Sequence, residues 1–135
     1  MSPEEIVAKM LDNDPYSQWL GVEVVSIEKG DVVVQAEVKS QMLNGFSVAH
    51  GGITYALSDS SLAFSANTHG RHAVSIETSI SHIAPVFEGD ILTTKVQEVS
   101  HSNKIGIYHV DIVNQHDVIV SNFKGTVFFK SNNWQ

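Results

Sequence analysis

Residues 44–59 read NGFSVAHGGITYALSD, and they begin the longest part of the chain that lacks the pattern of a β-strand. Asn44-Gly45 is a pair typical of turns. From Ala49 to about Asn67 the residues are small and of mixed polarity, with many Ala, Ser and Gly positions that let a helix lie close to another surface. Gly70 follows as a suitable helix stop. The segment therefore predicts a buried central helix.

On both sides of this helix the chain is rich in β-branched residues and alternates in polarity, as half-buried strands do. Two strands, 22–27 and 32–38, precede the helix and form a hairpin around residues 29–31, with a shift of phase at Val24-Val25 that indicates a bulge. Four strands follow the helix, at 72–83, 91–99, 105–113 and 118–129. No helix separates these four strands, so the connections are short and the sheet is antiparallel.

The first residues predict a separate short helix. Ser2-Pro3-Glu4-Glu5 supplies a cap, a proline at the first helical position and a capping box, and residues 12–15 end this helix. Neither an internal repeat nor a linker is visible, so residues 1–135 form a single domain with an N-terminal helix in residues 1–15. The order of elements predicts an α+β fold in which one antiparallel sheet is wrapped around a long central helix.

Composition excludes several classes of partner and several kinds of chemical site. The chain has 8 Lys and Arg against 15 Asp and Glu, which gives a formal net charge of −7 and makes nucleic acid an unsuitable partner. It has no Cys, so disulfides, thiolate metal sites and cysteine nucleophiles are excluded. The N-terminus lacks the apolar region of a signal peptide, and no apolar run is long enough to span a membrane. We therefore expect no membrane partner and a cytoplasmic location.

The start of the central helix is the candidate site. His50-Gly51-Gly52 places unpaired N–H groups and the positive end of the helix dipole where a ligand carbonyl can approach, as in an oxyanion hole. Asp59 follows Gly51 by about 12 Å along the helix axis, which is too far for both to act on one bond within one chain. A two-fold dimer would bring Asp59 of one chain close to Gly51 of the other.

Each of these residues also has a structural interpretation. His50 can cap the helix or bond a neighbour, and Gly51-Gly52 can allow close packing of helix and sheet. A lone Asp in a helix is usually solvated. Asp59, however, is the only Asp, Glu, Lys or Arg between Lys39 and Arg71, and burying it without a partner is costly.

The histidines do not predict a metal site. The seven His residues show neither H-x-H nor H-E-x-x-H spacing. His69 and His72 together with Asp59 form only a weak candidate set of ligands. We therefore expect no metal.

The pattern N-G-x-x-x-x-H-G-G followed by a helical Asp resembles the hotdog-fold acyl-CoA thioesterases, specifically the phenylacetic acid degradation (PaaI-type) family. The resemblance extends from about Tyr16 to Phe129 and includes a second matching stretch from Val74 to Asp90. It implies a hotdog fold and hydrolysis of aryl- or arylacetyl-CoA. No cofactor is required, because coenzyme A is part of the substrate. The resemblance also implies a dimer unit that assembles into a tetramer.

The resemblance also implies roles for individual residues. Asp59 matches the catalytic carboxylate, either as nucleophile on the thioester carbonyl or as general base for water. Gly51 matches the residue whose N–H polarises the thioester oxygen, with His50 beside it in a supporting role. Asn44 matches the amide that positions the carboxylate or the water from the opposite subunit. Ser75 matches a polar residue that helps to hold the water.

Further residues are expected to contact the two parts of the substrate. Leu43, Phe46, Gly52 and Ser75 would contact the acyl portion, and Val48, Leu62 and Phe64 would help to set its size. The coenzyme A portion would contact two turns, through Val86, Gly89, Ser100, Ser102, Asn103 and Lys104. Lys104 and Lys124 would offset the phosphate charge.

Three alternatives stay open at this point. Related thioesterases linked to menaquinone and enterobactin carry Glu in place of Asp59, so the Asp favours the PaaI-type family. A hotdog hydratase or dehydratase would use a His paired with a carboxylate in a different arrangement. A non-catalytic acyl-CoA-binding regulator usually carries an added DNA-binding segment, and only about fifteen residues precede the sheet, too few for a helix-turn-helix.

Overall fold

The computed structural model describes all 135 residues, from Met1 to Gln135. The helices are α1 (Pro3–Asp12), α2 (Pro15–Leu20), the 3-10 turn η1 (Ser40–Met42) and α3 (Gly51–Asn67). The strands are β1 (Glu23–Glu28), β2 (Asp31–Glu37), β3 (Arg71–His82), β4 (Ile91–His101), β5 (Ile105–Val113) and β6 (Ile119–Asn133). No helix combines the length and the apolar character that crossing a bilayer requires.

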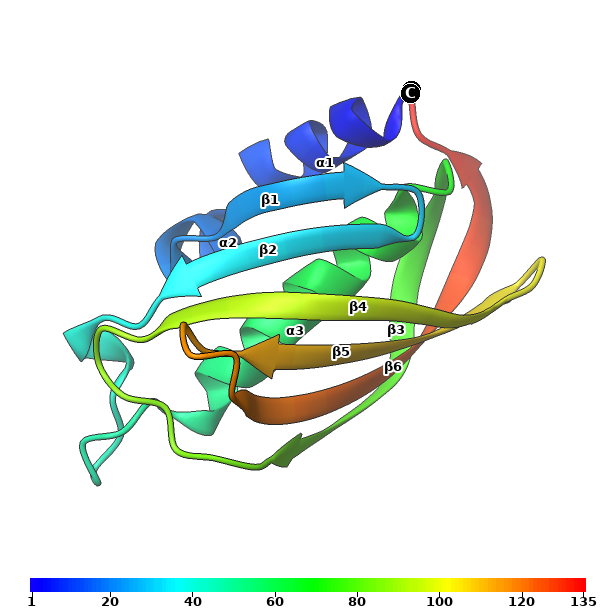
Figure 1. Ribbon diagram of the computed structural model, residues 1–135. Coiled ribbons are helices and arrows are strands. Elements are labelled where there is room, and N and C mark those ends of the chain that lie inside the picture. Colours follow the sequence, from blue (N-terminus) through cyan, green and yellow to red (C-terminus); the bar gives the residue numbers. More distant parts are fainter.

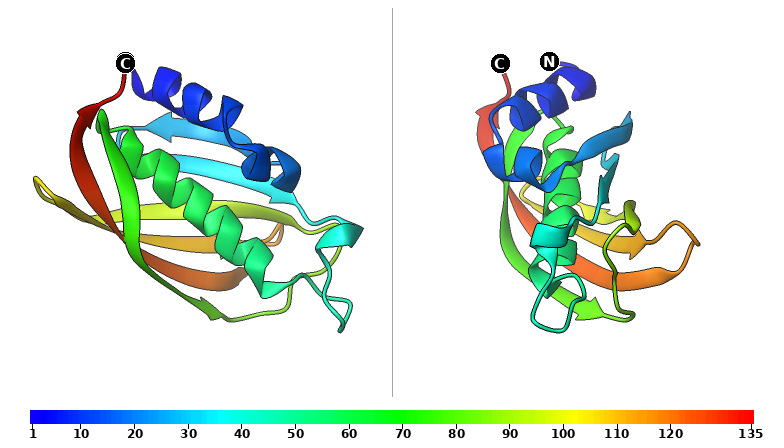
Figure 2. Two further views of the ribbon diagram at one scale, coloured as in Figure 1. Left: turned by 180° about the vertical axis from the view of Figure 1, so that it is seen from behind. Right: turned by 90° about the vertical axis from the view of Figure 1, so that its left-hand side faces the viewer.

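The six strands form one antiparallel sheet in the order β1-β2-β4-β5-β6-β3. The sheet curves around α3, which lies across its concave face (Figures 1 and 2). The α+β class and the hotdog fold predicted from the sequence are thus confirmed, as is the bulge in β1, where the pairing with β2 shifts between Val24 and Ser26.

The strand β3 is placed by a partner that is distant in sequence. Residues 83–90 connect β3 to β4 without pairing the two strands, and β3 instead pairs with β6 from Ala73↔Phe129 to His82↔Ser121. Because β6 is the only neighbour of β3, the other side of β3 is a free edge of the sheet. This edge runs beside α3 (Figure 2).

Small side chains let α3 approach the sheet closely. Ser61 Oγ donates to the carbonyl of Val32 at 2.7 Å, and Ser65 Oγ accepts from the N–H of Val32 at 2.9 Å. In β6, a Cβ on Gly125 would lie 2.5 Å from Leu62 Cδ2, so a side chain there would displace Leu62. The prediction of a buried helix packed against another surface is confirmed.

Two apolar clusters form the core around the contact between α3 and the sheet. Phe64 packs in the larger cluster, with Leu57 and the β2 residues Val32 and Val34. Leu62 packs in the smaller cluster with residues of β5 and β6. Both side chains are fully buried, so the expectation that Leu62 and Phe64 line an acyl pocket is wrong. Their apolar character serves the core.

A second N-terminal helix, α2, was not predicted. Asp14 caps it, because Asp14 Oδ1 accepts from the N–H of Ser17 at 2.9 Å, and Pro15 is its first residue. Gly21, in the left-handed conformation with φ of 79°, ends it. The residues around Pro15 end α1 and also begin α2, and the sequence analysis predicted only the end of α1. Ser17 Oγ lies 2.8 Å from Ser60 Oγ, which ties α2 to α3.

Candidate active site

The N-terminus of α3 leaves one backbone donor unused. His50 is the cap: its Nδ1 accepts from the N–H of Gly52 at 2.9 Å, and its carbonyl accepts from the N–H of Ile53 at 2.9 Å. The N–H of Gly51 donates to no acceptor within the chain. This N–H is therefore free to bind a carbonyl oxygen or oxyanion at the positive end of the helix dipole.

The Cα of Gly51 is covered by a histidine from β3. A Cβ on Gly51 would lie 3.0 Å from His82 Nε2, so a side chain there would crowd the imidazole. Thr54 Oγ1 donates to the carbonyl of Gly51 at 3.1 Å and lies 3.4 Å from His82 Nδ1. His82 and Thr54 thus belong to the site, although the sequence analysis assigned neither a role. Nothing in the spacing of His82 connects it with Gly51, because the pairing of β3 with β6 brings it there.

Asn44 is held in a tight loop beside the helix terminus. Its backbone N–H donates to the carbonyl of Val48 at 2.8 Å, and its Oδ1 accepts from the N–H of Phe46 at 2.8 Å. The loop therefore uses the acceptor of the side chain and leaves the Nδ2 amide as a free donor. Asn44 and Gly51 line the same cavity, of about 350 Å³, together with Thr54 and His82. The structure brings these two predicted residues together.

Asp59 lies in a second cavity, of about 470 Å³. The other residues that line it are Asp14, Tyr16, Ser17, Gly52, Tyr55, Ala56 and Ser60. The half-buried carboxylate of Asp59 forms no ion pair and no hydrogen bond within the chain. Burial raises the pKa of Asp59, and the negative charge of Asp14 raises it further. Asp59 is thus a carboxylate without a partner and with raised basicity, as a base or nucleophile requires.

Three hydrogen bonds hold residues that line this second cavity. Asp14 Oδ2 accepts from Ser17 Oγ at 2.6 Å, and Ser17 in turn bonds Ser60, the neighbour of Asp59. On the other side, Tyr55 Oη lies 2.5 Å from Thr78 Oγ1 in β3. Sequence reasoning missed these residues, because those of α2 were not assigned to a helix and Thr78 is one of several polar residues in β3.

Within one chain the two cavities are separate. Gly51 borders the first and Asp59 the second, and the intervening turns of the continuous helix put them about 12 Å apart along its axis. Only Gly52, of the glycine pair, borders the cavity of Asp59. Within one chain, Gly51 and Asp59 therefore do not line a common cavity.

Three predicted contacts to the acyl group lie elsewhere in the chain. Leu43 packs against the core, and Phe46 is 89% exposed at the tip of its loop. Ser75 lies in β3 opposite Val127 and borders neither cavity. Within one chain, none of these three residues lines the cavity of Gly51 or the cavity of Asp59.

The predicted coenzyme A contacts fall into two groups. Val86 has a buried side chain, and its carbonyl accepts from the N–H of Ala49 at 2.7 Å, whereas Gly89 forms an exposed turn. The other group comprises Ser100, Ser102, Asn103 and Lys104 at the β4–β5 hairpin. The 11 residues of β4 separate the groups by about 36 Å (Figure 1). One chain does not bring both groups together.

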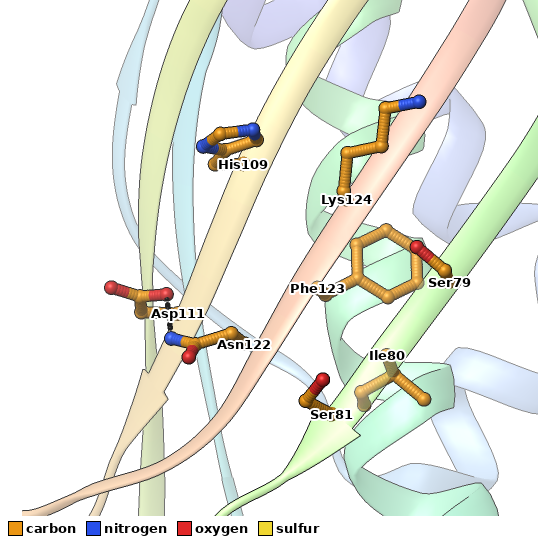
Figure 3. A pocket seen from close by; sticks show the side chains of 8 residues that line it. All are labelled: Ser79, Ile80, Ser81, His109, Asp111, Asn122, Phe123 and Lys124. Atoms are coloured by element: carbon orange, nitrogen blue, oxygen red, sulfur yellow. Dashed lines mark hydrogen bonds between the residues drawn. The ribbon is translucent and has the colours of Figure 1, made fainter.

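Lys124 lies on the outer face of the sheet. It lines a polar surface cavity of about 380 Å³ with Asp111 and Asn122, which hydrogen bond to each other (Figure 3). Lys124 Nζ donates to Glu77 Oε1 at 2.8 Å. Its charge is thus paired with a carboxylate, and it borders neither of the two cavities that hold Gly51 and Asp59.

The fold and the site together define a class of protein. The model of the thioesterase superfamily matches residues 46–121, which include Gly51, Asp59 and His82. The chain belongs to the thioesterase superfamily.

Known relatives narrow this assignment. Acyl-coenzyme A thioesterase PaaI of Escherichia coli is 36% identical over 116 residues, which cover 86% of this chain and 83% of that protein. The solved structure of the E. coli PaaI protein from the phenylacetic acid degradation operon matches with a TM-score of 0.94 at 32% identity, covering 97% and 95% of the two chains. The structure of smu.793 from Streptococcus mutans bound to acetyl CoA matches with a TM-score of 0.81 at 28% identity, covering 84% and 91%. Within the superfamily, the chain is of the PaaI type of acyl-CoA thioesterases.

The charge interaction between Asp14 and Asp59 predicts a shift in pH dependence. Asp14→Asn removes a negative charge that raises the pKa of Asp59, so the acidic limb of kcat/KM should move to lower pH. Asn caps a helix as well as Asp does, so α2 should stay intact. The measurement is the pH profile of hydrolysis of one acyl-CoA. Asp12→Asn, which removes a charge nearby in sequence, is the control, and an unshifted limb in Asp14→Asn would contradict the prediction.

Proposed function

We propose that the chain hydrolyses aryl- or arylacetyl-CoA thioesters to the free acid and coenzyme A. The observation that carries the proposal is the free N–H of Gly51 at the N-terminus of α3, combined with the unpaired carboxylate of Asp59. Thioester hydrolysis needs a donor for the developing oxyanion and a base or nucleophile, and these two groups supply them without a metal.

The chemical step follows from these two groups. The thioester oxygen accepts a hydrogen bond from Gly51 N–H, so its carbon becomes more electrophilic. Asp59 either takes a proton from the attacking water or attacks the carbon itself to give an anhydride that water then opens. In both routes the C–S bond breaks, the sulfur leaves as the thiol of coenzyme A, and one water is consumed. The free amide of Asn44 would orient the water or the carboxylate.

We further propose that a two-fold dimer completes the site. Strand β3 has a free edge 12 residues long, on which Val74 and Ile76 are 48% and 57% exposed. Antiparallel pairing of two such edges would remove the edge and set the two α3 helices side by side. Asp59 of one chain would then face Gly51 and Asn44 of the other. The dimers would assemble further into a tetramer, in the cytoplasm.

The lining of the Asp59 cavity supports an aromatic acyl group. Tyr16 and Tyr55 line it, together with the small residues Gly52 and Ala56. Aromatic rings stack or meet edge to face at a favourable energy of about 0.5–1.5 kcal/mol beyond their buried area. This favours an aryl or arylacetyl group over a linear chain of the same size.

A panel of thioesters tests this proposal. Thiol release would be followed for phenylacetyl-, hydroxyphenylacetyl-, benzoyl-, hexanoyl- and palmitoyl-CoA. We expect kcat/KM for the aromatic members to exceed that for hexanoyl-CoA, the linear member of similar size, by about 2- to 13-fold, the value of one such ring contact. Tyr16→Leu should narrow this difference. Absence of release from every member would reject the thioesterase function, and equal release from all would reject the aromatic preference alone.

A further inference from the structure

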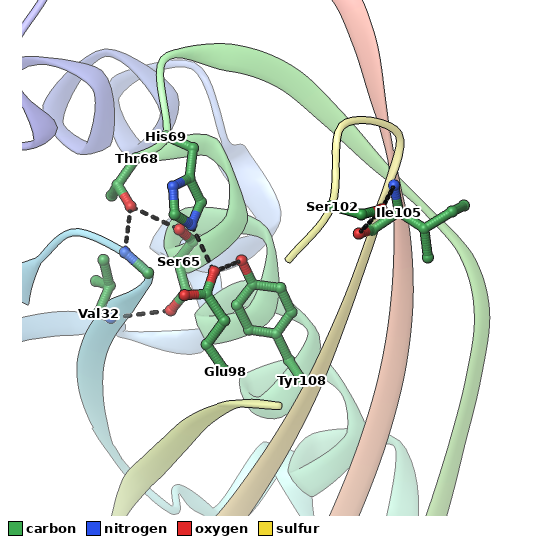
Figure 4. Close-up of polar contacts among 9 residues, drawn as sticks. Val32, Ser65, Thr68, His69, Glu98, Ser102, Ile105 and Tyr108 are labelled. Carbon is green, nitrogen blue, oxygen red and sulfur yellow. Dashed lines mark hydrogen bonds and ion pairs between the residues drawn. The ribbon is translucent and has the colours of Figure 1, made fainter. Parts of the chain in front are cut away.

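A group of metal-ligand side chains lies at the opposite end of α3 from Gly51. His69 follows the helix, and Glu98 and His101 come from the end of β4. One nitrogen of each imidazole and one carboxylate oxygen lie within 4.8 Å of one another. His69 Nε2 is 2.5 Å from Glu98 Oε1 (Figure 4). We propose that His69, Glu98 and His101 bind one Zn²⁺ ion.

The donor set selects the kind of ion. Two imidazole nitrogens and one carboxylate oxygen suit Zn²⁺, whereas Mg²⁺ and Ca²⁺ prefer oxygen ligands alone. Three protein ligands leave the fourth tetrahedral position to water. The three ligands come from two segments, residues 69 and 98–101, which explains why no short histidine motif in the sequence revealed them.

The surroundings hold the ligands as the outer shell of a metal site does. Tyr108 Oη donates to Glu98 Oε1 at 2.6 Å, which orients the carboxylate (Figure 4). The ring of Phe129 meets both imidazoles nearly edge-on, with centroids at 5.9 Å from His69 and 4.8 Å from His101. Gly30 makes room for the carboxylate, because a Cβ there would lie 2.8 Å from Glu98 Oε2.

Two positive charges near the cluster oppose binding. Arg71 and Lys29 act on His101 through their charges and reduce its affinity for a cation. A carboxylate and a neutral imidazole are the forms that bind metal.

Binding requires two local adjustments. The two imidazoles are stacked, with centroids 3.9 Å apart and planes inclined by 11°. A bound ion lies in the plane of each ligand ring, so the rings cannot remain parallel. His101 is exposed at the end of β4 and can turn about its Cβ–Cγ bond. Second, the hydrogen bond between His69 Nε2 and Glu98 Oε1 has to open, because ligand atoms in a tetrahedral zinc site lie about 3.3 Å apart and these two are at 2.5 Å.

The ion would have a structural role. The helix α3 separates the cluster from Gly51 by about 25 Å, so the ion does not contact the thioester. It would instead join the turn after α3 to the end of β4. Zinc should raise the melting temperature and leave thioester hydrolysis unchanged.

Titration of the untagged, chelator-treated full chain with Zn²⁺ tests the proposal. Calorimetry should show one ion per chain, and a concentration about 100 times the Kd should raise Tm by roughly 5–10 °C. His101→Gln and Glu98→Gln should each weaken binding at least tenfold, and His116→Gln, in the exposed β5–β6 turn, should bind as the native chain does. His101→Gln is the decisive variant, because Glu98 also holds Tyr108.

Three results would overturn the proposal. These are the absence of saturable zinc binding, equal binding by the native chain and His101→Gln, and equal binding of Mg²⁺ and Zn²⁺. Because the titration contains no acyl-CoA, its outcome is independent of the thioesterase function.

Discussion

Asp59→Asn is expected to lower kcat for acyl-CoA hydrolysis by about 10³-fold or more, because a base or nucleophile commonly contributes 10²–10⁴-fold and Asn provides neither. The amide has nearly the same shape as the carboxylate, so the cavity with Tyr16 and Tyr55 should persist. The measurement is single-turnover and steady-state thiol release. Near-native turnover in Asp59→Asn would refute the role of this residue.

The same variant should be more stable than the native chain near pH 7. The folded chain holds the pKa of Asp59 above its ordinary value, so the folded state binds this proton more tightly than the unfolded state does. The free energy of unfolding therefore falls as the pH rises from the pKa of Asp59 in the unfolded chain through its pKa in the folded chain. Above both pKa values, the full cost of burying the carboxylate is present. Asn removes that cost. A higher Tm together with lost turnover would separate a catalytic defect from unfolding.

Gly51→Pro is expected to lower kcat by about 10²–10³-fold, the usual effect of removing one donor to an oxyanion. Proline removes the N–H, and it is tolerated at the first position of a helix, which Gly51 occupies. The preceding residue, His50, has φ of −59° and ψ of 140°, a conformation that a following proline permits. The backbone around the substitution should therefore be preserved.

Gly51→Ala is the matched control. It adds the Cβ that would lie 3.0 Å from His82 Nε2 but retains the N–H. A moderate effect of alanine and a large effect of proline would assign the loss to the missing donor. Equal losses would instead assign it to crowding of His82 and would contradict the oxyanion role.

Mixing the two inactive variants tests whether the site is shared. In a dimer of one Asp59→Asn chain and one Gly51→Pro chain, one site would have both native groups and the other would have neither. Random exchange of subunits should thus restore about a quarter of native activity. No recovery, with exchange verified by mass, would show that both groups act within one chain.

Most of the fold could be predicted from local patterns. Alternation of polarity located every strand to within a few residues, and the small residues between Ala49 and Asn67 predicted a helix packed against the sheet. The failures have physical causes. Asp14-Pro15 is equally a helix stop and a helix start, and α2 has only 6 residues. The position of β3 at the edge depends on pairing with β6, which no local pattern encodes.

The site was predictable where it depends on one helix terminus. The free N–H of Gly51 follows from its place at the start of α3, and the isolation of Asp59 in sequence indicated an unpaired carboxylate. His82 and Tyr16 line the two cavities through tertiary contacts, and Thr78 contacts the hydroxyl of Tyr55, so spacing could not reveal them. Leu62 and Phe64 were predicted to line a pocket but lie in the core, because apolar character alone does not distinguish a pocket residue from a core residue.

The placement of β3 has a consequence for synthesis on the ribosome. Its partner β6 begins at Ile119, after residues 83–118 have been added. At about 5–20 residues per second, about 2–7 s pass between the synthesis of β3 and the start of β6, and β3 lacks its partner strand for that time. The strand β6 thus completes the sheet and, by fixing His82 against Gly51, the candidate site as well.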